Sequence, residues 1–305
     1  MPGEQALPFS NSTTQTLMAS SVTSSGTKRQ SGSQTPAAKR AKQGAAKEQA
    51  ITLTFCECGE NHPGMQKVGQ KAACGFDLDD LRGAQTWFER RGCITELVDL
   101  VAAGRVQDHA DVAPAAVLLV RGGVNVLLQD QADADALMAE QQRLVPDKKF
   151  LDRRRQRVLN KRARWNLCFA NEAQVADYEA GKGTIVAFDA VPLMAAVREI
   201  LPEALGDRAR NMVAEGNYYY DAGNCGIGFH GDGERSRVVG IRLGASMPLH
   251  FQWFENRKEP IGERVRLMLH HGDLYVMSEK AVGRDARRRL VPVLRHAAGA
   301  PKYLN

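Results

Sequence analysis

The stretch from Asn217 to Gly244, NYYYDAGNCGIGFHGDGERSRVVGIRLG, constrains the fold most strongly because short extended segments alternate with glycine-rich turns around His230 and Asp232. Alternate side chains of an extended strand share one face, so this imidazole and this carboxylate can converge on one ion. Two histidines and one carboxylate hold one face of a non-haem Fe(II) and leave the other coordination positions open. The pattern therefore predicts a third ligand, a histidine on a later strand.

The third ligand must come from a small set of downstream histidines: His250, His270, His271 and His296. We select His296 because Val291 to His296 is the last extended, β-branched run in the chain. An isolated His-x-Asp also fits a surface turn, so the neighbouring motifs decide between the two interpretations.

Further motifs accompany the metal pattern in a fixed order: Asn217-Tyr218-Tyr219, His230-Gly231-Asp232, Arg242-Leu243-Gly244, His250-Phe251-Gln252-Trp253-Phe254 and Gly272-Asp273-Leu274-Tyr275-Val276-Met277. Together they resemble the AlkB-type branch of the 2-oxoglutarate and Fe(II)-dependent dioxygenases, from roughly Phe150 to the C-terminus. The resemblance implies an α+β fold with a double-stranded β-helix (jelly-roll) core and flanking helices. It also implies Fe(II) bound by His230, Asp232 and His296, dioxygen and 2-oxoglutarate as co-substrates, and Asn217 and Tyr219 bonded to 2-oxoglutarate.

The resemblance fails at one position. Relatives of this type carry an arginine after the distal histidine that binds the far carboxylate of 2-oxoglutarate, and no arginine follows His296. A dicarboxylate in a partly dry pocket still needs a fixed cation. We favour Arg242, because basic residues on the corresponding strand have this role in JmjC and asparagine-hydroxylating relatives, and we keep Lys302 as the second candidate. In the competing interpretation, Arg242 is a solvated strand residue or contacts a substrate phosphate.

The implied reaction couples decarboxylation of 2-oxoglutarate to hydroxylation of a C–H bond, and an N-methyl group hydroxylated in this way is lost as formaldehyde. The resemblance favours oxidative demethylation or repair of alkylated nucleic acid bases. A nuclear protein hydroxylase or demethylase is the alternative, and a non-catalytic nucleic-acid-binding protein is the third. The metal ligand set argues against the third, because a binding module has no need of it.

The chain divides by composition into a tail (1–50), an N-terminal α+β region (51–147) and a catalytic domain (148–305). The tail is rich in Ser, Thr, Gln, Gly, Ala and Lys and is predicted to be disordered. Its clusters Lys28-Arg29 and Lys39-Arg40-Ala41-Lys42 are typical of a nuclear localisation signal or a nucleic-acid-binding arm, although a solvated tail fits too. We therefore expect a nuclear protein, otherwise a cytoplasmic one.

The N-terminal region carries no catalytic pattern that we can identify. Cys56, Cys58, His62 and Cys74 suggest zinc, but the one-residue spacing of the first pair argues against it. Residues 78–103 are predicted as helices, 113–128 as two strands around a Gly-Gly turn, and 133–144 as a helix. We expect this region to pack on the catalytic core or to recruit a partner.

Basic residues concentrate in two segments, 148–166, where Phe150 and Trp165 are interleaved with them, and 284–289. Lys and Arg neutralise phosphates and aromatic rings stack on bases, so nucleic acid is the predicted partner. The net charge of +6 favours this prediction, although charge runs are more often solvated faces. No apolar run has the length of a bilayer span and no secretory signal is recognised, so we expect an intracellular protein without membrane contact.

Overall fold

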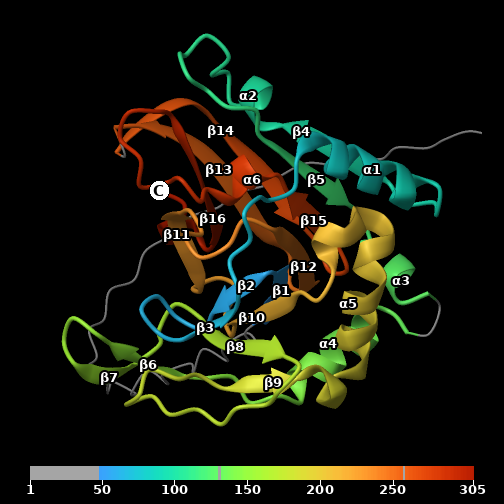
Figure 1. The fold of residues 1–305 in the computed structure, drawn as a ribbon, viewed down its shortest axis with the longest axis vertical. Helices are drawn as coiled ribbons and strands as arrows, with labels where there is room; N and C mark the ends of the chain where they lie inside the picture. Colours follow the sequence, from blue (N-terminus) through green and yellow to red (C-terminus); the bar gives the residue numbers. More distant parts are fainter. Residues whose placement is uncertain (1–47, 130–131, 257) are drawn as a thin grey trace, which may run out of the picture. The chain divides into compact units, whose positions relative to one another are not determined.

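The computed structural model describes residues 48–129, 132–256 and 258–305 (Figure 1). These residues fall into one compact unit with a mixed α+β fold and several antiparallel sheets. Residues 1–47 of the predicted tail, with its basic clusters, lie outside the described residues, and Ala50 begins the first strand. No helix of the described residues is long and apolar enough to cross a membrane.

The largest sheet has the strand order β4-β5-β15-β12-β1-β10-β8-β9. Its strands are β1 (Ala50–Cys56), β4 (Thr95–Asp99), β5 (Ala116–Val120), β8 (Trp165–Ala170), β9 (Ile185–Ala187), β10 (Val213–Tyr219), β12 (Val238–Gly244) and β15 (Leu274–Met277). Strand β1 pairs with β10 on one side and β12 on the other. The predicted N-terminal region and the predicted catalytic region therefore share this sheet.

The second sheet has the order β11-β16-β13-β14. Its strands are β11 (Gly226–His230), β13 (Met247–Glu255), β14 (Glu259–Leu269) and β16 (Val293–Gly299). Two hairpins complete the strands: β2 (Cys58–Glu60) with β3 (Lys67–Gly69), and β6 (Lys149–Asp152) with β7 (Arg157–Asn160).

The α-helices are α1 (Leu78–Glu89), α2 (Leu100–Ala103), α3 (Gly123–Leu127), α4 (Ala134–Gln142), α5 (Pro192–Leu205) and α6 (Glu279–Val282), with 3-10 turns η1 (Phe188–Ala190), η2 (Gly206–Ala209) and η3 (Pro301–Tyr303). Helix α1 begins with a capping box, in which the side chains of Asp77 and Asp80 accept each other's backbone N–H. Helix α5 has proline at its first position, where no N–H partner is needed.

Helices α1, α3, α4 and α5 pack on one face of the large sheet (Figure 1). Strand β1 shows why this face is apolar: Ile51, Leu53 and Phe55 are fully buried against the helices, and the alternating Thr52 and Thr54 point to the opposite face. A second apolar cluster, which includes Trp253 of β13 and Tyr275 of β15, lies between the two sheets. The site described below lies on this inner side.

The local predictions for residues 78–144 were confirmed in part: α1, β5 and α4 lie where helices and a strand were expected. Residues 123–127 form helix α3 and not a second strand. Gly122 adopts a φ of 61° and turns the chain out of β5, and Val124 and Leu127, three residues apart, are buried on one side of the helix. Residues 95–99, predicted as helical, form β4, while the helix predicted at 133–144 is α4.

Candidate metal site

Strands β11 and β16 bring the three predicted metal ligands together. His230 ends β11 and lies directly opposite His296 of β16, and Asp232 follows two residues later. The Asp232 Oδ1 atom is 3.4 Å from His230 Nε2 and 3.9 Å from His296 Nε2. One ligand atom from each residue lies within 4.8 Å of the other two. These three residues can therefore hold a metal ion, and within the described residues they are the one such group of histidine, cysteine and acidic side chains.

The turn after helix α6 fixes the conformation of the His-x-Asp motif. The Asp232 N–H donates to the Val282 carbonyl at 3.0 Å. A Cβ atom on Gly231 would lie 2.0 Å from the Gly283 carbonyl oxygen, so only glycine allows this close approach. Gly283 itself has a φ of 75°, which ends α6 and directs its carbonyl at the motif.

The tautomer of His230 and the protonation states of His296 and Asp232 suit a metal. His230 Nδ1 lies 2.8 Å from the Gly228 carbonyl oxygen, so this nitrogen is the donor and Nε2 is left as the ligand atom. Burial, together with His230, lowers the pKa of His296 to about 4, so its imidazole is neutral at pH 7. Burial would raise the pKa of Asp232, but Arg235 and the two histidines hold it well below its usual range. A neutral imidazole and an ionised carboxylate are the forms that bind metals.

A buried arginine supports the carboxylate ligand. Arg235 is 4% exposed and its Nε atom lies 3.6 Å from Asp232 Oδ2. The same guanidinium donates to Glu215 Oε2 at 2.7 Å and to Glu234 Oε1 at 2.5 Å. Arg235 therefore links the metal motif to β10 and keeps one Asp232 oxygen turned away from the histidines.

The triad opens into a pocket of about 560 Å³, here called the metal pocket. Its floor is a row of side chains on the large sheet, in which Thr52 of β1 lies directly opposite Asn217 of β10 and Arg242 of β12. Directly opposed residues of neighbouring strands point to the same face, so these three side chains lie side by side. In the next row Gly240 leaves room for the ring of Tyr275, which would lie 2.0 Å from a Cβ atom at this position.

Arg242 is the most unusual residue of the metal pocket. Its side chain is 1% exposed, and among the described residues it has no ion pair. Its Nη1 atom is 3.4 Å from the Met247 sulfur, and its Nε atom has no hydrogen-bond partner. The carboxylate that influences the pKa of Arg242, that of Asp273, already forms an ion pair with Arg121 at 2.5 Å. Burial lowers the pKa of Arg242, yet a guanidinium remains charged, so the pocket contains a buried cation without a counter-ion.

Asn217 and Tyr219, predicted to bind 2-oxoglutarate, both line the metal pocket on β10. The Asn217 Oδ1 atom accepts hydrogen bonds from Arg164 Nε and Asn166 Nδ2. Two donors converge on this atom, which fixes the amide orientation and turns its NH₂ group to other partners. Lys302 is different: it is exposed in η3, its Nζ atom lies over the Tyr303 ring, and it does not line the pocket.

Several residues of the site were missed by sequence reasoning. Thr52, Glu215, Arg235 and Tyr275 all line the metal pocket. The alternation in ITLTF was a usable signal for Thr52, because a polar residue on a strand with one apolar face must point away from the core. Nothing local distinguishes Arg235 from the other charges of GERSR, since its partner Glu215 lies on another strand.

No protein-family model matches the chain. The chain is 42% identical over 257 residues to an uncharacterized protein of Acanthamoeba polyphaga mimivirus, and this match covers 84% of the chain and 98% of the viral protein. The chain therefore belongs to the same family as that protein. The viral protein's description names no activity.

Proposed function

We propose that this member of the mimivirus protein's family is an Fe(II)- and 2-oxoglutarate-dependent dioxygenase that acts on alkylated nucleic acid bases. One observation carries the proposal: a single pocket contains both a two-histidine, one-carboxylate set and the buried, unpaired cation of Arg242. A buried guanidinium without an acid is costly unless an anionic ligand completes it. A dicarboxylate that chelates the metal at one end and reaches Arg242 at the other would satisfy both groups.

The two sheets support a double-stranded β-helix with an unusual chain order. Strands β10-β1-β12-β15 lie consecutively in one sheet, and β11-β16-β13-β14 form the other. Seven of these strands follow one another in sequence, and the eighth, β1, comes from the N-terminal side. We infer that β1 occupies the place of the strand that follows the distal histidine in the relatives. This explains why no arginine follows His296: Thr52 of β1 lies in that place, and Arg242 on the neighbouring strand provides the cation.

Each residue of the site then has a distinct task. His230, Asp232 and His296 hold iron, which suits imidazole and carboxylate ligands and supplies, when bound, the oxidation that couples decarboxylation of 2-oxoglutarate to hydroxylation of the substrate. Arg242 binds the far carboxylate, and the amide NH₂ of Asn217 donates to the co-substrate. Arg235 is a positioning residue that orients Asp232. Hydroxylation of an N-methyl group on a base would release formaldehyde.

The charge around the metal pocket supports nucleic acid as the substrate. Arg164, Arg284 and Arg287 line the pocket. The Nη1 atom of Arg284 donates to Ser236 Oγ at 2.9 Å and lies 3.8 Å from Glu279 Oε1. Cations around an opening attract phosphate groups, and a target base must be flipped out or single-stranded to enter such a pocket.

A protein hydroxylase or demethylase is the second candidate. The placement of the cation on β12, the strand after the metal motif, favours it, because JmjC-like relatives bind their co-substrate from this strand. The two candidates differ in their response to salt. Binding through many phosphate contacts weakens steeply as salt rises, whereas binding of a protein substrate need not.

The test is succinate formation from 2-oxoglutarate by purified protein with Fe(II) and ascorbate, with and without methylated single-stranded oligonucleotides. The proposal is supported if turnover rises with the methylated oligonucleotide and is lost in both His296→Ala and Arg242→Ala. Turnover that requires both residues but ignores nucleic acid favours the protein hydroxylase. No turnover, together with no binding of Fe(II) or 2-oxoglutarate by calorimetry, contradicts both.

Nuclear localisation is part of the proposal and rests on Lys28-Arg29 and Lys39-Arg40, which lie outside the described residues. Residues 1–47 fused to a fluorescent protein should concentrate it in the nucleus, and replacement of the four basic residues by glutamine should abolish this. Equal distribution of both fusions would contradict the prediction.

A further inference from the structure

A second cavity, of about 570 Å³, lies on one face of the β6–β7 hairpin and contains only positive charge. Its lining has five basic side chains, Arg155, Arg157, Lys161, Arg162 and Arg164, and no acidic one. We call this cavity the basic hollow. Such a concentration of one charge creates a strong local potential for anions.

The positive charges of the basic hollow are largely uncompensated. Arg157 and Arg162 are exposed, and their guanidinium groups have no hydrogen bond or ion pair among the described residues. Arg164 donates to the neutral amide of Asn217. Only Arg155 has an acid partner, Asp152, at 3.5 Å. Neutral acceptors orient a cation without cancelling its charge, so the hollow retains most of its potential.

Lys161 gives the hollow a fixed, buried cation. It is 7% exposed, and its Nζ atom donates to the backbone oxygen of Asn61 at 3.2 Å and to the Asn61 side-chain oxygen at 2.5 Å. The Asn61 amide in turn donates to Asp147 at 2.8 Å, which places the nearest acid one residue further away. A lysine held in this way faces an incoming anion at a set position, unlike a mobile surface lysine.

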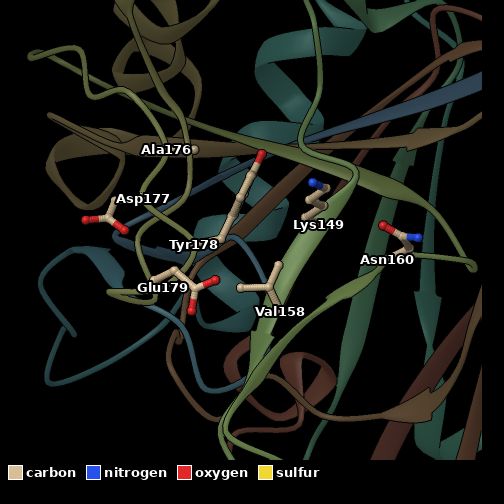
Figure 2. A pocket seen from close by; sticks show the side chains of 7 residues that line it. All are labelled: Lys149, Val158, Asn160, Ala176, Asp177, Tyr178 and Glu179. Carbon is tan, nitrogen blue, oxygen red and sulfur yellow. The ribbon is translucent and has the colours of Figure 1, made fainter.

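The opposite face of the same hairpin has a different character. A pocket of about 520 Å³ there is lined by Lys149 and Val158 of the hairpin and by Asp177 and Glu179 of the segment that follows β8 (Figure 2). Lys149 pairs with Asn160, and Phe150 pairs with Leu159, so successive pairs point to opposite faces. The acidic side chains Asp177 and Glu179 line this pocket, whereas the lining of the basic hollow, which lies beside the metal pocket, has no acidic side chain.

Arg164 connects the two cavities because it lines both the basic hollow and the metal pocket. A chain of phosphates in the hollow would therefore run up to the wall of the metal pocket. The nearby aromatic rings are already occupied: Phe150 stacks on His62 at 3.7 Å, and Trp165 stacks on Tyr220 at 4.4 Å. The hollow thus offers cations for phosphates and not open rings for bases.

We propose that the basic hollow binds the phosphates of single-stranded nucleic acid on the segment next to the nucleotide whose base enters the metal pocket. This inference rests on the proposed function, which supplies the base-modifying reaction. It assigns binding without sequence preference to the hairpin, because phosphate contacts carry no base information.

The experiment compares two double variants that remove the same charge. Arg157→Gln with Arg162→Gln removes two of the five cations of the hollow. Lys149→Gln with Arg154→Gln removes two exposed cations from the other face and the turn of the same hairpin. Fluorescence anisotropy with labelled, unmethylated single-stranded oligonucleotides of mixed sequence measures affinity across a salt series. The hollow variant should bind weakly, with a salt slope shallower by roughly 0.7 for each lost phosphate contact, while the control keeps the wild-type slope.

Equal affinities for wild type and both variants, or an equal loss in both variants, would overturn the proposal. Displacement of the oligonucleotide by an acidic polypeptide at equal charge concentration would overturn it as well. The assay contains no Fe(II) or 2-oxoglutarate, so it is independent of turnover. Specific binding at the hollow without iron or 2-oxoglutarate binding would contradict the proposed reaction alone, and 2-oxoglutarate turnover without oligonucleotide binding would contradict the hollow alone.

Discussion

Two of the arginines that line the metal pocket are almost completely buried, but their surroundings are opposite. Arg235, 4% exposed, lies among the carboxylates of Glu215, Glu234 and Asp232. Arg242, 1% exposed, contacts the Met247 sulfur and the face of Tyr219 and has no ion pair among the described residues. Their depth is nearly equal, so burial does not explain the difference.

The comparison separates a structural cation from a ligand-binding one. A charge that the protein pairs completely cannot bind a ligand without losing its own partners. The desolvation cost of an unpaired buried cation is offset only when an anionic ligand binds to it. Removal of each arginine should therefore damage a different property.

Removal of Arg235 should cause the largest effect, on folding. Arg235→Met leaves Glu215 buried without its partner, and burial already raises the pKa of that carboxyl against the effect of Arg235. We expect a loss of about 3 kcal/mol or more in the free energy of unfolding, measured by denaturant titration of the metal-free protein. Unchanged stability would mean that the pairing of Arg235 is not what distinguishes it from Arg242.

Removal of Arg242 should spare stability and damage ligand binding. Arg242→Met removes an unpaired buried charge, so the free energy of unfolding should change by less than about 1 kcal/mol or increase. The affinity for 2-oxoglutarate, measured by calorimetry with the metal bound, should fall roughly a hundredfold, which corresponds to about 3 kcal/mol for a lost charge-assisted contact. Lys302→Met is the matched control and should bind as wild type. A loss with Lys302→Met instead would transfer the role to that residue.

Substitution of Gly231 should reduce metal affinity because it moves the His-x-Asp motif. In Gly231→Ala the new Cβ would meet the Gly283 carbonyl oxygen, so the motif must move away from α6 and shift Asp232. Metal affinity should fall roughly tenfold, as for other changes that disturb ligand support. Gly233→Ala is the control, because a Cβ at that position has no heavy atom within 4 Å. Equal metal affinities in the two variants would show that the contact with α6 does not position the ligands.

The sequence was informative where the signal was local. His230, Asp232 and Arg242 could be placed because strand alternation assigns each side chain to a face from its immediate neighbours. His296 followed from the scarcity of late histidines on extended segments. The position of β1 could not be predicted, because its partners β10 and β12 lie far along the chain and nothing in ITLTF specifies them. Arg235 was missed for the same reason, since its role depends on Glu215 across the pocket.

The smallest predicted effect concerns His62. Like Arg242, it has an environment that disfavours its charged form, because it lies beside the cation of Lys161. Burial, together with Lys161, lowers the pKa of His62 to about 4. The pKa of a histidine in an unfolded chain is about 6.5. Between this pH and the folded pKa, the unfolded chain binds more protons than the folded chain. The free energy of unfolding therefore falls as the pH decreases through this range. His62→Gln should remove part of this loss, on the order of 1 kcal/mol after solvent screening, in denaturant titrations at about pH 7 and 5. His296 titrates in the same direction and is present in both proteins, so the difference between them isolates His62. Parallel pH profiles would mean that burial and the neighbouring cations together do not lower the pKa of His62 in the folded protein.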